Sequence, residues 1–171
     1  QKKIFVKEPR RVGKNVDFGT IDVEGQVGLA VDVFDQASGV SNVYAVYELE
    51  LKVDNQLLFH SKIDSFSYAQ SRQMFLDRVY GLLKSQNKGF QRLYRHDGNS
   101  LPFYKTAKPE AKLNLSEGMH QFEITARDFY QNETKAYGKL RVKQPDSLPE
   151  MLINSVVLPP KMPGQSFPEN L

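Results

Sequence analysis

Short stretches of alternating apolar and polar residues, separated by turn-forming residues, constrain the fold of this chain more than any other feature. The clearest is residues 119–128, where every second residue from His120 to Ala126 falls on one face. The same period of two predicts strands over residues 26–34, 43–53, 57–63 and 134–142. Asp54 and Asn55 lie between two of these stretches and indicate a hairpin turn. The chain is therefore expected to be mainly β, as an antiparallel sandwich.

One segment, residues 68–85, breaks this pattern. Its apolar residues recur at helical spacing, so it is expected to form a helix inserted in the sandwich at about residues 68–86. Ser67 or Ser71 can cap its start. Asn87 or Gly89 can end it.

The prolines divide the chain. Six of the nine lie after residue 144, and proline neither donates to a sheet nor continues a helix. We expect an N-terminal extension over residues 1–17, one sandwich domain over 18–144, and a proline-rich linker or extended arm over 145–171. The absence of an initiator methionine and a signal peptide suggests an excised or processed piece of a longer protein.

Composition excludes several kinds of site. The 171 residues contain no cysteine, so a disulfide, a thiolate zinc site and a cysteine nucleophile are absent. No apolar run is long enough for a membrane span. His60, His96 and His120 match no metal-binding spacing and are expected to be surface or half-buried side chains. We therefore predict no catalytic, metal or cofactor-binding residue in this chain.

Two aspartates leave an alternative open. Asp35 and Asp128 each follow a strand, so they could meet at one end of a sandwich and bind calcium. No calcium-loop motif supports this, and the favoured interpretation is that they cap the backbone of their own turns.

Residues 72–112, here called the basic segment, contain nine basic and three acidic residues, a net charge of +6 in a chain of +3. Aromatic residues are interleaved with the cations, and such a surface can hold a polyanion or a sugar. The simpler interpretation is a solvated face whose aromatic residues belong to the core. The candidate ligand surface consists of Arg72, Arg78, Lys88, Arg92, Tyr94, Arg95 and Tyr104. No DNA- or RNA-binding motif is present, so nucleic acid is not an expected partner.

Several ordered motifs resemble one family. They are Gly25–Asp35 (GQVGLAVDVFD), Val43–Tyr44 with the strand that runs to Val53–Asn55, Asp64–Tyr68 with Arg72, Gln91–Tyr94, Gly98–Tyr104, and Glu117–His120 followed by Arg127–Asn132. In this order they resemble the immunoglobulin-like accessory domain of lysostaphin-type zinc metallopeptidases of Gram-negative bacteria. The resemblance covers roughly residues 18–142.

The resemblance implies an immunoglobulin-like sandwich that is not itself an enzyme. The zinc ligands of that family, an His-x-x-x-Asp pair and an His-x-His pair, do not occur here, so zinc is expected only in a peptidase domain absent from this chain. The implied role is to position or regulate that domain in the periplasm or another extracytoplasmic space. Implied partners are the peptidase domain or other envelope proteins, and the resemblance assigns the domain no ligand. Peptidoglycan or an anionic glycan is the partner expected of the basic segment. Two alternatives are a glycan- or polyanion-binding module that uses the basic segment, and an enzyme whose active site is dispersed along the chain.

Overall fold

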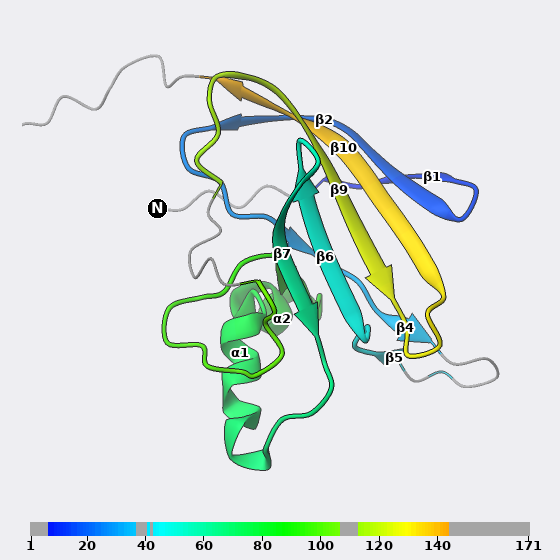
Figure 1. Cartoon of the computed structure of the whole chain (residues 1–171), viewed down its shortest axis with the longest axis vertical. Coiled ribbons are helices and arrows are strands. Elements are labelled where there is room, and N and C mark those ends of the chain that lie inside the picture. Colours follow the sequence, from blue (N-terminus) through cyan, green and yellow to red (C-terminus); the bar gives the residue numbers. More distant parts are fainter. Residues whose placement is uncertain (1–6, 37–40, 42, 107–112, 144–171) are drawn as a thin grey trace, which may run out of the picture.

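A six-stranded sheet is the largest element of the computed structural model, which describes residues 7–36, 41, 43–106 and 113–143. Its strands, in spatial order, are β1 (Arg10–Val12), β2 (Asn15–Glu24), β10 (Glu133–Lys143), β9 (Gly118–Arg127), β6 (Glu48–Val53) and β7 (Gln56–Lys62) (Figure 1). The expected arm over residues 145–171 lies outside the described residues.

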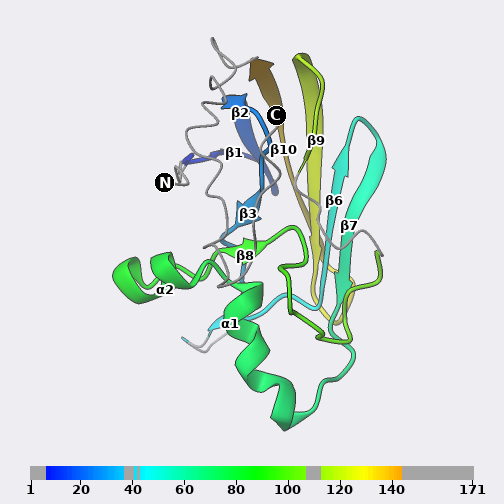
Figure 2. The same cartoon turned by 90° about the vertical axis from the view of Figure 1, so that its left-hand side faces the viewer.

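A second, more irregular layer covers one face of this sheet (Figure 2). It contains the short pair of β3 (Ala30–Val31) and β8 (Gln91–Arg92), and the helical segment. A further short pair joins β4 (Asp35–Gln36) to β5 (Val43–Tyr44). The protein is therefore a mainly β sandwich with a short helical segment, as predicted.

Alternation along β6 explains why the two layers join. Leu49, Leu51 and Val53 are buried, whereas the residues between them face the other side of the sheet. At the turn that follows, Asp54 and Asn55 have φ values of 49° and 66°. Two successive positive φ values are typical of a tight hairpin turn, which confirms the predicted hairpin between β6 and β7.

The core lies between the sheet and the second layer. Buried apolar residues of the sheet contact Val31, Leu93 and Leu113 of the second layer. The sheet contributes Leu49, Leu51, Val53, Phe59, Phe122, Ile124 and Leu140. This shared apolar burial is the main term that stabilises the sandwich.

The strand predicted over residues 26–34 is much shorter in the structure. Only β3 is a strand there, and Val27 forms an isolated bridge with Leu113. The predicted alternation of burial is nevertheless present, since Leu29 and Val33 pack on the core. A Cβ on Gly28 would lie 2.8 Å from Cε1 of Tyr94, so glycine is required there by a side chain that packs against it.

The helical segment lies where it was predicted, but it is broken. It consists of the 3-10 helix η1 (Tyr68–Gln73), α1 (Met74–Asp77) and α2 (Tyr80–Gln86). Ser67 caps its start, and Asn87 ends it in the left-handed conformation with φ of 53°. The break occurs because Arg78 is extended and forms a β-bridge with Gln91.

Two features of the main sheet were not predicted. Residues 10–17, expected to belong to an extension, form β1 and the beginning of β2. In addition, β2 pairs with β10 in parallel, so the sheet is not wholly antiparallel. A parallel pair needs a long connection between its strands, and here almost the whole domain separates them. In the described part of the chain, no helix is long and apolar enough to cross a membrane.

Candidate functional site

The structure separates the seven residues of the predicted ligand surface. Arg78, Arg92 and Tyr104 surround the buried Asp77, together with Asn99. These five residues are called the Asp77 cluster. Tyr94 packs against Gly28, while Arg72, Lys88 and Arg95 are not bonded to the cluster.

Asp77 is only 1% exposed, and its carboxylate is the centre of the cluster. The Tyr104 hydroxyl donates to Asp77 Oδ1 at 2.6 Å, and Asn99 Nδ2 donates to the Tyr104 oxygen at 2.9 Å. Arg78 Nε lies 3.4 Å from Asp77 Oδ2. A buried carboxylate requires such partners, because desolvation of an isolated charge is costly.

Burial sets the ionisation of this cluster. Desolvation raises the pKa of Asp77, although the hydrogen bond from Tyr104 and the charges of Arg78 and Arg92 oppose it. Desolvation, followed by the charge of Asp77, raises the pKa of Tyr104 far above its usual value. Tyr104 is therefore a neutral hydrogen-bond donor at physiological pH.

The two arginines of the cluster also hold the broken helix. Arg78 donates through Nη1 to the Gly89 carbonyl at 2.8 Å. Arg92 Nη1 donates to the Leu76 carbonyl at 2.9 Å and to the Arg78 carbonyl. These carbonyls lie in or beside the helical segment, so the guanidinium groups satisfy backbone acceptors that have no helical partner.

The remaining cations of the basic segment are nearer to solvent. Arg72 is exposed, and Arg95 is half-buried. Lys88 Nζ lies 3.7 Å from Glu8. Lys105 Nζ lies 3.0 Å from Asp64. Lys84, on α2, is exposed. Of these five described cations, two therefore already have a carboxylate partner.

The sheet face that points away from the second layer, here called the outer face, carries a denser set of charges. Arg127 Nη1 lies 3.0 Å from Glu50 and 3.6 Å from Glu48, and Nη2 lies 2.9 Å from Glu133. Burial disfavours the charge of Arg127, but hydrogen bonds to Glu50 and Glu133 raise its pKa. The strand register brings these residues together, since Glu48 and Glu133 both stand opposite Arg127.

His60 completes a group that could coordinate a metal ion. Ligand atoms of Glu48, Glu50 and His60 all lie within 4.8 Å of one another, an arrangement that sequence spacing did not predict. His60 Nε2 is 2.7 Å from Glu48 Oε1. Because Arg127 already supplies a cation to both glutamates, a metal ion would have to displace it.

His120 is bonded at both ring nitrogens. Nδ1 lies 2.6 Å from Asp54 Oδ2, and Nε2 lies 2.9 Å from the Ser116 carbonyl. Both partners are acceptors, so the doubly protonated ring satisfies both contacts. The hydrogen bond to Asp54 and then that to Ser116 raise the pKa of His120, whereas the pKa of Asp54 is lowered by His120 and by the Gln121 amide.

Asp128 has the capping role that the sequence favoured. Its Oδ1 accepts from the Asn132 amide at 2.8 Å, and its Oδ2 accepts from Asn132 Nδ2 at 2.7 Å. The side-chain bond from Asn132 lowers the pKa of Asp128. Asp35 instead pairs with Tyr44 in the ladder between β4 and β5.

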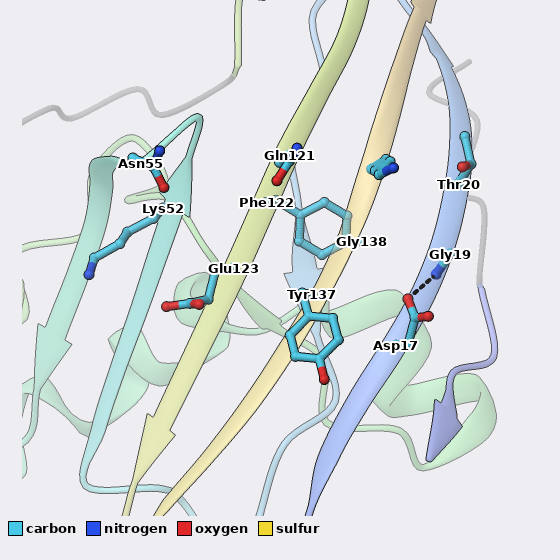
Figure 3. Close-up of a pocket in the computed structure, with 11 residues that line it drawn as sticks. Asp17, Gly19, Thr20, Lys52, Asn55, Gln121, Phe122, Glu123, Tyr137 and Gly138 are labelled. Atoms are coloured by element: carbon cyan, nitrogen blue, oxygen red, sulfur yellow. Dashed lines mark hydrogen bonds between the residues drawn. The ribbon is translucent and has the colours of Figure 1, made fainter. Parts of the chain in front are cut away.

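A hollow of about 630 Å³ lies across the outer face between the β6–β7 turn and β2. We call it the outer groove (Figure 3). Its polar lining comes from four strands and one turn: Asp17 and Thr20 (β2), Lys139 and Tyr137 (β10), Gln121 and Glu123 (β9), Lys52 (β6) and Asn55. Gly19, Phe122 and Gly138 complete it.

None of these groove residues belonged to the predicted ligand surface. A usable signal was present in the alternation, which placed residues such as Glu48 and Lys52 on the face opposite the core. The neighbouring strands that complete the groove could not be identified, because their order depends on pairing between distant parts of the chain.

No protein-family model and no curated protein matches this chain. Among solved structures, the fibronectin(III)-like modules of Clostridium thermocellum CbhA match 74% of this chain and 88% of their own, with 12% identity and a TM-score of 0.32. The first Ig-like domain of human CD48 antigen matches 83% of this chain and 94% of its own, with 14% identity and a TM-score of 0.36. Domains of these two classes are typically non-catalytic modules, but likenesses this distant assign neither a family nor a function.

Proposed function

We propose that this chain is a non-catalytic accessory module of an extracytoplasmic, peptidoglycan-metallopeptidase-like protein, and that it positions or regulates the peptidase domain. The supporting observation is that polar residues in the stretches resembling that family bond within the module. Side chains used in this way hold the module's own segments together, as a scaffold requires.

Two contacts illustrate this use. Asp64 accepts from the Tyr47 hydroxyl at 2.8 Å and from Lys105 Nζ at 3.0 Å, which joins the chain after β7 to the residue that precedes β6 and to the loop that follows β8. Ser100 donates its amide to Gln73 Oε1 at 2.6 Å, which holds the same loop against the helical segment.

The Asp77 cluster adds the buried part of this scaffold. Tyr104 and Asn99 both lie in a stretch that resembles the family, and both are bonded within the cluster. The alternative function, polyanion binding by the basic segment, is less well supported. Arg78, Arg92 and Tyr104 are bonded within the module and are not free to contact a ligand.

Two experiments test the accessory role. The isolated chain, incubated with peptidoglycan fragments and zinc, is expected to release no cleavage product, and turnover that a chelator abolishes would overturn the proposal. In the full-length parent protein, deletion of residues 18–144 is expected to reduce cleavage of intact sacculi more than cleavage of small soluble muropeptides. Equal activity with and without the module on both substrates would contradict a positioning or regulatory role.

A further inference from the structure

The outer groove differs from the other polar clusters because most of its polar side chains are unused. Among the described residues, Lys52, Asn55, Tyr137 and Lys139 make no side-chain hydrogen bond or ion pair. The side chains of Thr20 and Gln121 likewise have no described partner. Two ammonium groups, two amides and two hydroxyls therefore belong to the lining and have no described side-chain partner.

The carboxylates of the groove are, by contrast, already bonded. Asp17 Oδ1 accepts from the Gly19 amide at 2.7 Å, a contact drawn in Figure 3. Glu123 Oε1 lies 3.2 Å from Lys135 Nζ. Lys135 pairs with Glu123, but an amide hydrogen bond leaves Asp17 negatively charged, so the two groove lysines exceed the unpaired acid by one. The net charge of the lining is therefore positive, which favours a ligand with anionic groups.

The width of the groove argues for an extended ligand. Lys52 is on β6 and Lys139 is on β10, with β9 between them. Neighbouring strands are ~4.8 Å apart, so two steps separate the lysine backbones by ~10 Å. A single phosphate or sulfate ion is too small to contact the whole lining, whereas a chain of linked rings can cross the strands.

Tyr137 lies on β10, the strand that also carries Lys139, and offers an aromatic ring to the groove (Figure 3). Its half-buried ring offers an apolar face and a polar hydroxyl, and no described aromatic ring stacks on it. The other exposed lining groups are hydrogen-bonding side chains, which suit the hydroxyl and ring oxygens of a sugar. Apolar side-chain pockets that would anchor a peptide are not part of this lining.

The shape of the groove depends on backbone packing at its centre. The pairing of β10 with β2 shifts register between Tyr137 and Lys139, and Gly19 opposite has φ of 63°. A Cβ on Gly138 would come within 2.7 Å of the Phe122 ring and 2.8 Å of the Gly19 carbonyl oxygen. The groove is thus built on a specific irregularity of the sheet.

We propose that the outer groove binds an acidic oligosaccharide, with Tyr137 under one sugar ring and Lys52 and Lys139 paired with ligand carboxylates. Asn55, Gln121 and Thr20 contact its hydroxyl groups. This inference goes beyond the proposed accessory role and does not depend on it, since a groove can bind glycan whether or not a peptidase accompanies the module.

The test is a calorimetric and NMR titration of the chain with hexagalacturonate, a uronic-acid hexamer, beside the neutral hexamer cellohexaose. Hexagalacturonate is expected to bind more tightly, to weaken as salt is added, and to shift the amide signals of Gly19, Gln121 and Gly138. Tyr137→Ala is expected to weaken binding about tenfold. Lys139→Gln and Lys52→Gln are each expected to weaken it about fivefold.

Matched controls separate this site from general charge. Lys84→Gln removes an exposed lysine from α2, far along the chain from the groove, and is expected to leave hexagalacturonate binding unchanged. Tyr137→Phe keeps the aromatic ring, so it is expected to retain most of the affinity. It also serves as the folded control if Tyr137→Ala fails to fold.

Three results would overturn the proposal: equal affinity for the neutral hexamer, equal losses in Lys84→Gln and Lys139→Gln, or amide shifts confined to residues outside the groove. Tighter and salt-dependent binding of linear polyphosphate at the same residues would also overturn it, since the groove would then select charge without sugar. None of these outcomes bears on the cleavage and deletion experiments that test the accessory role.

Discussion

The Asp77 cluster and the outer groove contain similar side chains in opposite states. In the cluster, Arg78, Arg92 and Tyr104 are bonded to a buried carboxylate or to backbone carbonyls. In the groove, Lys139 and Tyr137 have no described partner. A cation therefore indicates a ligand surface only when the fold leaves it unpaired. A run of charged residues in the sequence does not show which of its cations are paired in the fold.

The largest expected effect is at the centre of the cluster. Asp77→Ala should lower the free energy of unfolding by about 3 to 5 kcal/mol, because it leaves arginine and tyrosine groups buried without their acceptor. Urea unfolding measures this, with Asp22→Asn as a matched control. Asp22 is half-exposed and pairs with Arg141 at 3.3 Å, so its loss should cost less than about 1 kcal/mol. Equal losses in the two variants would remove the distinction between buried and surface carboxylates.

The same change, a cation replaced by glutamine, should separate the two regions directly. Arg92→Gln is expected to lower the free energy of unfolding by about 2 kcal/mol, because its hydrogen bonds to two carbonyls are lost. Lys139→Gln should change it by less than about 0.5 kcal/mol. If Lys139→Gln were as destabilising as Arg92→Gln, then the groove lysine would be structural.

Backbone packing at the groove can be tested with a pair of glycines. Gly138→Ala is expected to lower the free energy of unfolding by about 1 to 3 kcal/mol, since the added Cβ would overlap the Phe122 ring. Gly81→Ala, in α2, meets nothing within 4 Å and should stabilise by up to about 1 kcal/mol through helix propensity. A neutral Gly138→Ala would show that the sheet relaxes easily at this irregularity.

The smallest effect concerns the turn at one end of the groove, where Asp54 is bonded to His120. The pKa of His120 is raised in the folded state, so its contribution is fully present below about pH 6.5 and is lost as the pH rises through the folded value. The pKa of Asp54 is lowered, so its contribution is lost as the pH falls below about 3.8. Because Asp54 is half-exposed, each change should be less than about 1 kcal/mol.

The free energy of unfolding, measured from about pH 5 to about pH 9, tests this assignment. This range spans the ordinary histidine pKa of ~6.5. His120→Asn is expected to flatten the decline in stability above pH 6.5. His96→Asn is the control, because His96 is exposed and its ring bonds, among described residues, only to the adjacent Asp97 carbonyl. A decline that persists in His120→Asn would assign it to another group.

Local patterns predicted the parts of the fold that depend on neighbours in sequence. The alternation of Leu49, Leu51 and Val53, the turn at Asp54 and Asn55, and the helix ends at Ser67 and Asn87 are all confirmed. Each follows from the preference of a few adjacent residues for one backbone conformation or one face.

The remaining features depend on distant partners. Asp77 is one of three acids among nine cations, which suggests a solvated residue, yet the bridge between Arg78 and Gln91 breaks the helix and Asp77 is buried beside that break. Strand β2 was not predicted, because Gly19 and the polar residues around it interrupt the alternating pattern. Its pairing with β10 creates the irregular centre of the groove. Neither the burial of Asp77 nor the pairing of β2 with β10 can be predicted from a short stretch of sequence.

The parallel pairing of β2 with β10 has a mechanical consequence. In the described part of the chain, β1 pairs only with β2, so it is the first strand to bear the force when the module is pulled by its two ends. Beyond β1, the force acts on the start of β2 and the end of β10 in opposite directions along strands that run the same way. The hydrogen bonds between them are then sheared together instead of opening one after another, so this pair resists a pull that would unzip a hairpin. A module joined this way can carry tension between whatever is attached at its two ends.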